Sequence, residues 1–392
     1  AVGMRQKTVV AAFAILSLAA CANAPQASRE APTTSTTEPA APTTTTTTLL
    51  PPDGKTSDER TLSVAFRVSN DNLQPKSIVH SGNGLFFAQN MMYRHNVSVF
   101  NREGKVVATI DDKVDLAAFG ISTVKMRSSI VKGSPVEAAF SPDSEFAYVS
   151  NYKMYGGGWN PITDDSCQGR NWDPSYVYRI STTSFVIDQV IEVGAVPKFL
   201  AVSPDNKFVV VSNFCSQDVS IIDIARGLEV QRVLVGSHPR GIAITNDSST
   251  AYVSVMGGGN VIAINLKDFT TRTLSSAGYT PRHLVLSPDN SVLYITNNKS
   301  GTVRAINPRT DTVIATVRTG TEPRTMVMSE DGASLYVVNY QDDQLSKIRT
   351  SDMKVIQTIA TGDRPIGVTY DADMRQVWVA NYSGSLTVYA DR

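Results

Sequence analysis

A proline recurs at a constant interval of 42 residues through the second half of the chain. The members of this series are Pro197, Pro239, Pro281, Pro323 and Pro365. Pro135 and Pro75 extend it toward the N-terminus, at intervals of 62 and 60 residues that leave room for an insertion in each of the first two units. A fixed period of this length is typical of solenoids and propellers, in which each repeat forms one structural unit. The sequence therefore predicts seven consecutive units.

Each unit contains four short segments typical of β-strands. In the unit that begins at Pro281 they are HLVLS (283–287), VLYITN (292–297), TVRAIN (302–307) and TVIATV (312–317). These segments are rich in β-branched residues, and turn-forming Asp, Asn, Gly and Pro separate them. Four strands at this period are typical of a propeller blade, so we expect an all-β, seven-bladed β-propeller with four antiparallel strands per blade.

The two ends of the domain are expected to share one blade. The last unit supplies only three strands after Pro365, and the missing fourth is predicted at LSVAFRV (62–68). Pairing the two ends closes the ring and removes a free edge strand that could pair with another chain. The propeller is therefore expected to occupy residues 61–392.

Residues 1–20 have the pattern of a secretion signal. Arg5 and Lys7 precede a short apolar segment, and small residues follow it up to Cys21. The LAAC tetrapeptide resembles the bacterial lipobox, which implies a lipid-modified Cys21; an ordinary secretion signal with a chance cysteine is the alternative. Residues 21–60 are rich in Pro and Thr and predict a disordered tether. We expect the protein outside the cytoplasm, held on a bacterial membrane or envelope by the lipid alone.

A short phrase recurs at the end of the second predicted strand of most units. It reads YVSN at residues 148–151 and YITN at residues 294–297. With the Ser-Pro-Asp turn that precedes it, the phrase resembles the repeat of the YVTN β-propeller family. The resemblance implies a propeller of the kind found among cell-surface and envelope proteins, to which some lactonases and lyases are related.

The residue after each proline is basic in five of the seven units. The five basic residues are Lys76, Lys198, Arg240, Arg282 and Arg324, and the other two units have Val136 and Ile366. The loops that enter the innermost strands lie on one face of a propeller, at the mouth of its channel. A ring of like charges is costly unless a bound anion or acidic neighbours offset it. We predict an anion-binding mouth; pairing with Glu137, Glu322 or Asp363, or extension into water, is the alternative.

Aromatic residues and two insertions are expected at the same mouth. Three tyrosines directly follow the Asn of the recurring phrase, namely Tyr152, Tyr340 and Tyr382. They either stack on a ligand or pack beneath the loops. The second unit inserts residues 151–174 with Trp159 and Trp172, and we take this insertion as the first candidate for a specificity element. The first unit adds residues 111–129 on the same face.

Cys167 and Cys215 remain once Cys21 is assigned to the lipid. Cys167 lies in the insertion of the second unit and Cys215 in the equivalent loop of the third, so neighbouring blades should bring them together. A compartment outside the cytoplasm permits disulfides. We predict a Cys167–Cys215 disulfide that holds the insertion. Two free thiols or a metal pair are the alternative, which lacks supporting His spacing.

Composition and motifs favour binding over catalysis. The 36 basic and 36 acidic residues balance, which argues against nucleic acid as a partner. The four His residues form no recognisable catalytic or metal motif, so we predict no cofactor and no metal site. Asp164 and Asp165 are interpreted as solvated turn acids rather than metal ligands.

We therefore expect a monomeric binding or scaffold module. Its mouth is predicted to take a protein, a glycan or another anion. The alternative is a lactonase-like hydrolase or lyase in which His238 and His283 act as acid or base beside the arginine ring.

Overall fold

The structure is a computed structural model that describes residues 49–122, 128–159, 165–168 and 172–392. The predicted signal peptide, Cys21, the tether up to residue 48 and Asp164 lie outside these residues. Within the described part of the chain, no helix is long and apolar enough to cross a membrane.

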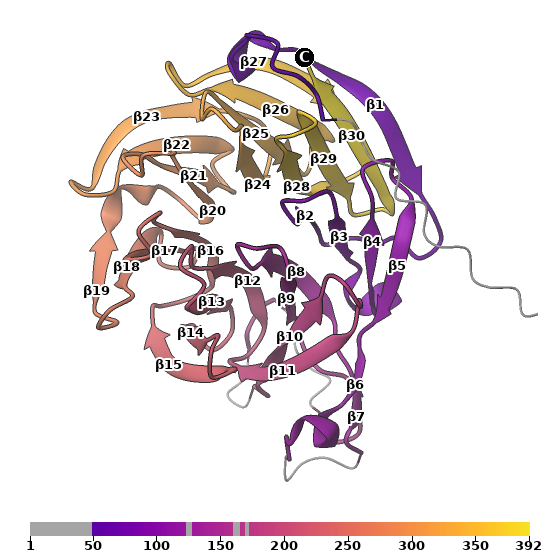
Figure 1. Ribbon diagram of the computed structural model, residues 1–392. Coiled ribbons are helices and arrows are strands. Elements are labelled where there is room, and N and C mark those ends of the chain that lie inside the picture. The colour runs from indigo at the N-terminus through magenta and orange to yellow at the C-terminus, as the bar shows by residue number, and fades with distance from the viewer. Residues whose placement is uncertain (1–48, 123–127, 160–164, 169–171) are drawn as a thin grey trace, which may run out of the picture. The chain divides into compact units, whose positions relative to one another are not determined.

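Seven four-stranded antiparallel sheets form a ring (Figure 1), which confirms the predicted β-propeller. Blade 1 contains β2 (Ser77–His80), β3 (Phe86–Gln89), β4 (Asn96–Phe100) and β5 (Val106–Asp111). Blade 2 contains β8 (Pro135–Phe140), β9 (Phe146–Asn151), β10 (Ser175–Ser181) and β11 (Ile187–Val193). Blade 3 contains β12 (Pro197–Val202), β13 (Phe208–Asn213), β14 (Asp218–Asp223) and β15 (Leu228–Leu234). Blade 4 contains β16 (Pro239–Ile244), β17 (Thr250–Val255), β18 (Asn260–Asn265) and β19 (Thr271–Leu274).

The remaining blades repeat this arrangement. Blade 5 contains β20 (Pro281–Leu286), β21 (Leu293–Asn297), β22 (Thr302–Asn307) and β23 (Thr312–Arg318). Blade 6 contains β24 (Pro323–Met328), β25 (Ser334–Asn339), β26 (Gln344–Arg349) and β27 (Lys354–Ala360). Blade 7 contains β28 (Pro365–Asp371), β29 (Gln376–Asn381), β30 (Ser385–Asp391) and β1 (Leu62–Ser69). Short helices are η1 (Ser57–Glu59), α1 (Met91–Arg94), η2 (Leu116–Phe119) and η3 (Ser275–Ala277), and β6 (Lys113–Asp115) pairs with β7 (Ile130–Lys132).

The Ser-Pro-Asp phrase forms the turn between the first two strands of a blade. In blade 5 the Ser287 hydroxyl donates to Asp289 at 2.7 Å and accepts from the Val292 N–H at 2.9 Å. Asn290 has φ +60°, a left-handed conformation that asparagine tolerates better than most residues. The phrase therefore recurs because it encodes the same turn.

The apolar core lies between neighbouring blades rather than at the centre of the ring. Trp378 of blade 7 is fully buried and stacks on Phe86 of blade 1, with 3.8 Å between ring centroids. Phe66 of β1 meets the same indole edge-on. Each interface buries the faces of two sheets, as expected for repeats that cannot bury their apolar faces alone.

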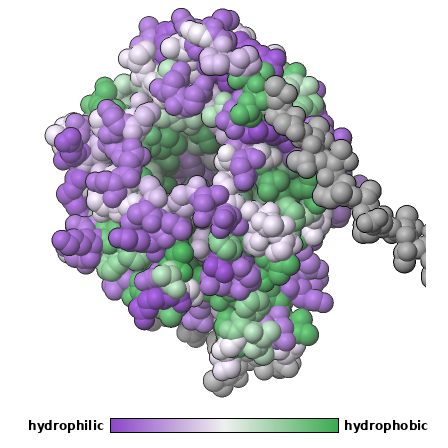
Figure 2. All heavy atoms as spheres, viewed as in Figure 1, coloured by the Kyte–Doolittle hydropathy of each residue, from purple (hydrophilic) through white to green (hydrophobic). Residues whose placement is uncertain are grey.

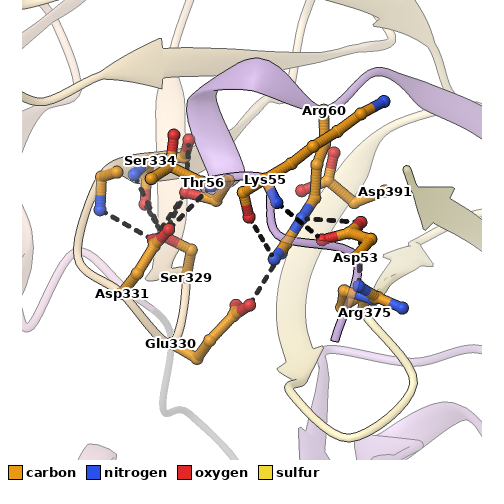
Figure 3. A network of polar contacts seen from close by, with 12 residues as sticks. Asp53, Lys55, Thr56, Arg60, Ser329, Glu330, Asp331, Ser334, Arg375 and Asp391 are labelled. Carbon is orange, nitrogen blue, oxygen red and sulfur yellow. Dashed lines mark hydrogen bonds and ion pairs between the residues drawn. The ribbon is translucent and has the colours of Figure 1, made fainter. Parts of the chain in front are cut away.

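An N-terminal strand closes the ring as predicted. β1 pairs antiparallel with β30, from Leu62 opposite Asp391 to Ser69 opposite Ser385. The ordered domain begins earlier than residue 61, because residues 53–60, which the composition assigned to the tether, lie against blades 6 and 7 (Figure 3). The Ser57 hydroxyl bonds Ser329, Asp331 and Ser334 at 2.7–2.9 Å.

A buried ion pair holds this N-terminal segment against blade 6. The ammonium of Lys347 in β26 donates to the carbonyls of Ser57 and Arg60 at 2.6 and 2.7 Å and to the Asp391 carboxylate at 2.7 Å. Both charged side chains are completely buried, and the Tyr336 hydroxyl also donates to Asp391. The segment is thus held by polar contacts rather than by apolar burial.

His95 joins both ends of the insertion in blade 1. Its Nδ1 lies 2.9 Å from the Asp112 carboxylate and 2.9 Å from the carbonyl oxygen of Gly133. The hydrogen bond to Asp112, against the opposing effect of burial, raises the pKa of His95. This histidine therefore positions the β6–β7 hairpin.

Candidate functional site

The side chains that follow the seven prolines line one cavity of about 100 Å³ at the mouth of the central channel. They are Lys76, Val136, Lys198, Arg240, Arg282, Arg324 and Ile366. Figure 2 shows that the centre of the ring is hollowed. A cavity of this size can hold several waters or a small anionic group.

In six of the seven blades the pairing of the first two strands shifts register after the phase-marking proline, and in four of them this β-bulge directs a second side chain toward the channel. The pairing of β20 with β21 shifts register between Pro281 and His283, and β8 shifts between Pro135 and Glu137. A bulge places two residues opposite one and turns the strand locally. As a result, Glu137 and His283, two residues after their prolines, also line the mouth cavity.

Hydroxyl groups of the recurring phrase position the cationic side chains. Ser254 of β17 accepts a hydrogen bond from the Gly241 N–H at 2.8 Å, and its hydroxyl donates to the Arg282 carbonyl of the next blade at 2.8 Å. The same role falls to Ser212 toward the Arg240 carbonyl at 2.6 Å. These hydroxyls lie on the second strands of their blades. Each one therefore links the innermost strand of its own blade to the backbone of the basic residue in the next blade.

We expect Ser254→Ala to lower the free energy of unfolding by about 1–3 kcal/mol, because two buried backbone groups lose their partner. Ser254→Thr keeps the hydroxyl and is the matched control, since Thr296 fills the equivalent position in blade 5 and bonds the Arg324 carbonyl at 2.9 Å. Chemical denaturation of the three proteins measures the difference. Equal losses for alanine and threonine would refute the role of the hydroxyl.

The cavity concentrates positive charge in a buried setting. Burial, together with repulsion among the cations, lowers the pKa of Lys76 to about 8 and that of Lys198 to about 7. Burial also lowers the pKa of Arg240 to about 10 and that of Arg282 well below its usual value. Burial raises the pKa of Glu137 to about 8, so this carboxyl is mostly neutral at pH 7.

The cations differ in their acidic partners. The Lys198 ammonium lies 2.5 Å from the Asp165 carboxylate, and the Arg324 guanidinium lies 3.4 Å from Glu322. Among the described residues, no carboxylate lies within ion-pair distance of the remaining three, which are Lys76, Arg240 and Arg282. Glu137 and Asp363 are not ion-pair partners of the ring, so the predicted pairing with acidic neighbours is present only in part.

The tyrosines that follow the recurring phrase pack against the cations. Lys76 lies over the Tyr382 ring at 4.5 Å, Lys198 over Tyr152 at 4.5 Å, and Arg324 over Tyr340 at 3.5 Å. Tyr152 is buried, while Tyr340 and Tyr382 are half-buried. Cation–π contacts of this kind stabilise the charged side chains and hold them in place. Their contact with a ligand stays a prediction.

The predicted disulfide is confirmed, since Cys167 and Cys215 are bonded. Trp172 lies beside the bond and lines a separate groove of about 660 Å³ with both cysteines. Trp159 packs edge-on against Tyr176, with 6.0 Å between ring centroids, in the cluster around Leu116. Neither tryptophan lines the mouth cavity, so the structure does not bring them to the five basic residues.

The two histidines of the enzyme hypothesis occupy different surroundings. His283 lines the cavity, where burial and neighbouring arginines lower its pKa to about 3 and make it a weak base. His238 stacks on Phe214 at 4.4 Å and is not among the lining residues. Over the described parts of the chain, no group of three or more His, Cys, Asp or Glu is arranged to hold a metal ion.

Several residues of the site were not selected from the sequence. Asp165, for which the sequence predicts a solvated turn acid, lines the cavity, as do Met91 of α1 and Phe199. Glu137 was named only as a partner for the cations. Glu137 and Phe199 share one signal, because both stand two positions after a phase-marking proline.

Comparisons with known proteins show the fold alone. One chain of hydrazine synthase from Kuenenia stuttgartiensis is similar with a TM-score of 0.63 and 19% identity, covering 82% of this chain and 96% of that chain. A chain in a crystal structure of the mitotic checkpoint complex is similar with a TM-score of 0.66 and 12% identity, covering 84% and 91%. No family model and no curated protein matches the sequence.

Proposed function

We propose that the protein is a binding module whose mouth cavity holds an anionic ligand. The observation that carries the proposal is the convergence of five basic side chains on one small cavity. Three of them have no ion-pair partner among the described residues, and a bound anion would offset their mutual repulsion. Arginine also offers a planar pair of donors that matches a carboxylate or phosphate.

The ligand in this proposal is a small anion or the acidic group of a protein or glycan. The cavity of about 100 Å³ admits a single compact group, and larger ligands would extend outward past the loops. The exposed Tyr93 side chain, whose hydroxyl bonds that of Tyr382, can contact such an extension.

Anion affinity is expected to fall as the pH rises from about 6 to about 9. Lys198 and Lys76 titrate near pH 7 and 8 in the free protein, and a bound anion favours their charged forms. Deprotonation of Glu137 near pH 8 adds a repelling charge, which acts in the same direction. Because one pKa unit equals about 1.4 kcal/mol, we expect acetate binding to weaken at least about tenfold across this range.

Calorimetric titrations with acetate at several pH values measure this dependence. The titratable and charged groups that surround the two lysines are Glu137, Tyr152, Asp165, His238, Arg240, Arg282, His283, Arg324 and Tyr382. Glu137→Gln keeps a neutral side chain and should remove the part of the change near pH 8. An affinity that stays constant or rises with pH would contradict an anion at these lysines.

The cellular setting is part of the same proposal. A lipid on Cys21 and a YVTN-type repeat would make this an extracytoplasmic, membrane-tethered propeller, and the disulfide supports an oxidising compartment. We expect Cys21→Ala to release the protein from the membrane fraction into the medium or periplasm of a bacterial host. Retention of the variant on the membrane would contradict the lipid anchor.

A further inference from the structure

Asp165 places a carboxylate of the chain itself in the mouth cavity. It belongs to the insertion between β9 and β10, and its Oδ1 lies 2.5 Å from the Lys198 ammonium. The Lys198 side chain is only 6% exposed, whereas that of Asp165 is 63% exposed. The Lys198 side chain is therefore part of the cavity wall, and the Asp165 carboxylate contacts it from the solvent-exposed side of the cavity.

The charge of Asp165 acts on the whole ring. It favours the protonated form of all five basic residues, Lys76, Lys198, Arg240, Arg282 and Arg324. Glu322 has this effect on Arg282 and Arg324, and Glu137 has it on Arg240. In return, Lys198 and other cations of the ring outweigh the effect of burial and hold the pKa of Asp165 well below its usual range. Asp165 thus lies where an external anion would interact with most of the ring.

The disulfide restrains Asp165 close to Lys198. Cys167 stands two residues after Asp165, and its partner Cys215 directly follows Phe214 in the chain. The Phe214 ring lies 5.1 Å from the Lys198 ammonium, so the bond is anchored next to the same lysine. A tether of this kind raises the effective concentration of Asp165 at the cavity.

We propose that Asp165 is a tethered internal ligand, that the mouth cavity is a carboxylate site, and that an external carboxylate binds by replacing Asp165 at Lys198. This inference rests on the anion-binding function proposed above. The group that already occupies the site is a carboxylate, and it makes a short charge-assisted hydrogen bond of the kind an external carboxylate would make. Asp165 would then set the affinity threshold for the ligand.

The test compares acetate and inorganic phosphate binding to the wild-type protein and to Asp165→Asn by calorimetry. We expect Asp165→Asn to bind acetate about tenfold more tightly, because the competitor is gone. Asp363→Asn removes the same charge from an exposed loop and is the matched control, for which we expect no comparable gain. The carboxylate assignment predicts that Asp165→Asn binds acetate more tightly than phosphate, and a preference for phosphate would overturn it.

A second variant tests the tether. Cys167→Ser with Cys215→Ser should reproduce most of the gain in acetate affinity, provided that its circular dichroism matches the wild type; if it does not fold, Asp165→Asn alone decides. Wild-type binding of acetate with no gain in Asp165→Asn would overturn the internal-ligand proposal and leave the anion site standing. Failure of every variant to bind either anion would instead overturn the proposed function itself.

Discussion

Arg240→Gln combined with Arg282→Gln is expected to weaken anion binding at least about 100-fold and, in the opposite direction, to stabilise the ligand-free fold. Both guanidinium groups line the mouth cavity without an ion-pair partner among the described residues. Loss of two charge-assisted hydrogen bonds costs a ligand about 3–6 kcal/mol, and about 2.7 kcal/mol already corresponds to 100-fold. Removing two buried like charges should raise the free energy of unfolding by about 1 kcal/mol or more.

Opposite effects on binding and stability separate a functional charge from a structural one. Residues kept for ligand binding often reduce the stability of the free protein. The control is Arg309→Gln with Arg318→Gln, which removes the same net charge from exposed positions of blade 5. Calorimetric titration with acetate and differential scanning calorimetry without it measure the two quantities. A double variant of Arg240 and Arg282 that is less stable than wild type would show that the arginines support the fold instead.

Lys347→Met is expected to lower the free energy of unfolding by about 3–5 kcal/mol, because it leaves the Asp391 carboxylate buried without its counter-ion. The ammonium also serves the carbonyls of Ser57 and Arg60, so the N-terminal segment should detach before the propeller unfolds. Scanning calorimetry measures the loss, and limited proteolysis reports cleavage near residue 60.

Two further variants complete this test. Lys354→Met removes a lysine whose side chain is 72% exposed and should change stability little. Combining Lys347→Met with Asp391→Asn should recover part of the loss, because no unpaired charge remains in the core. A loss for Lys347→Met no larger than that for Lys354→Met would refute the role of the buried pair in ring closure.

The repeat explains why the architecture could be predicted. The proline period sets the strand order, and the residue after each proline faces the channel in every blade, so the seven ring positions follow from spacing alone. The disulfide followed from the same logic, because Cys167 and Cys215 occupy equivalent loops of neighbouring blades.

Features that break the repeat could not be read in this way. The bulges after Pro135 and Pro281 add Glu137 and His283 to the cavity, and a strand pattern does not reveal a bulge. Asp165 lies in an insertion that has no counterpart in the other blades. Residues 53–60 have the composition of a linker, and their partners, such as Asp331, lie more than 270 positions away in the sequence.

The sequence identifies the basic residues of the ring, but it does not identify the hydroxyl groups that position them. The serines at the third position of the recurring phrase looked like ordinary strand residues, yet Ser212 and Ser254 fix the carbonyls of Arg240 and Arg282. A hydrogen bond between blades joins residues 28 positions apart in these cases. Once the fold is known, the same spacing identifies Thr296, which bonds the Arg324 carbonyl in blade 5.

The position of a bound anion tests the proposed mouth site most directly. A crystal of the protein is soaked in selenate, and anomalous data are collected at the selenium edge. The anomalous peaks then show where selenate binds. The mouth site predicts the strongest anomalous peak within hydrogen-bond distance of the Arg240 and Arg282 guanidinium groups. Selenate bound elsewhere on the surface, with none in the mouth cavity, would contradict it.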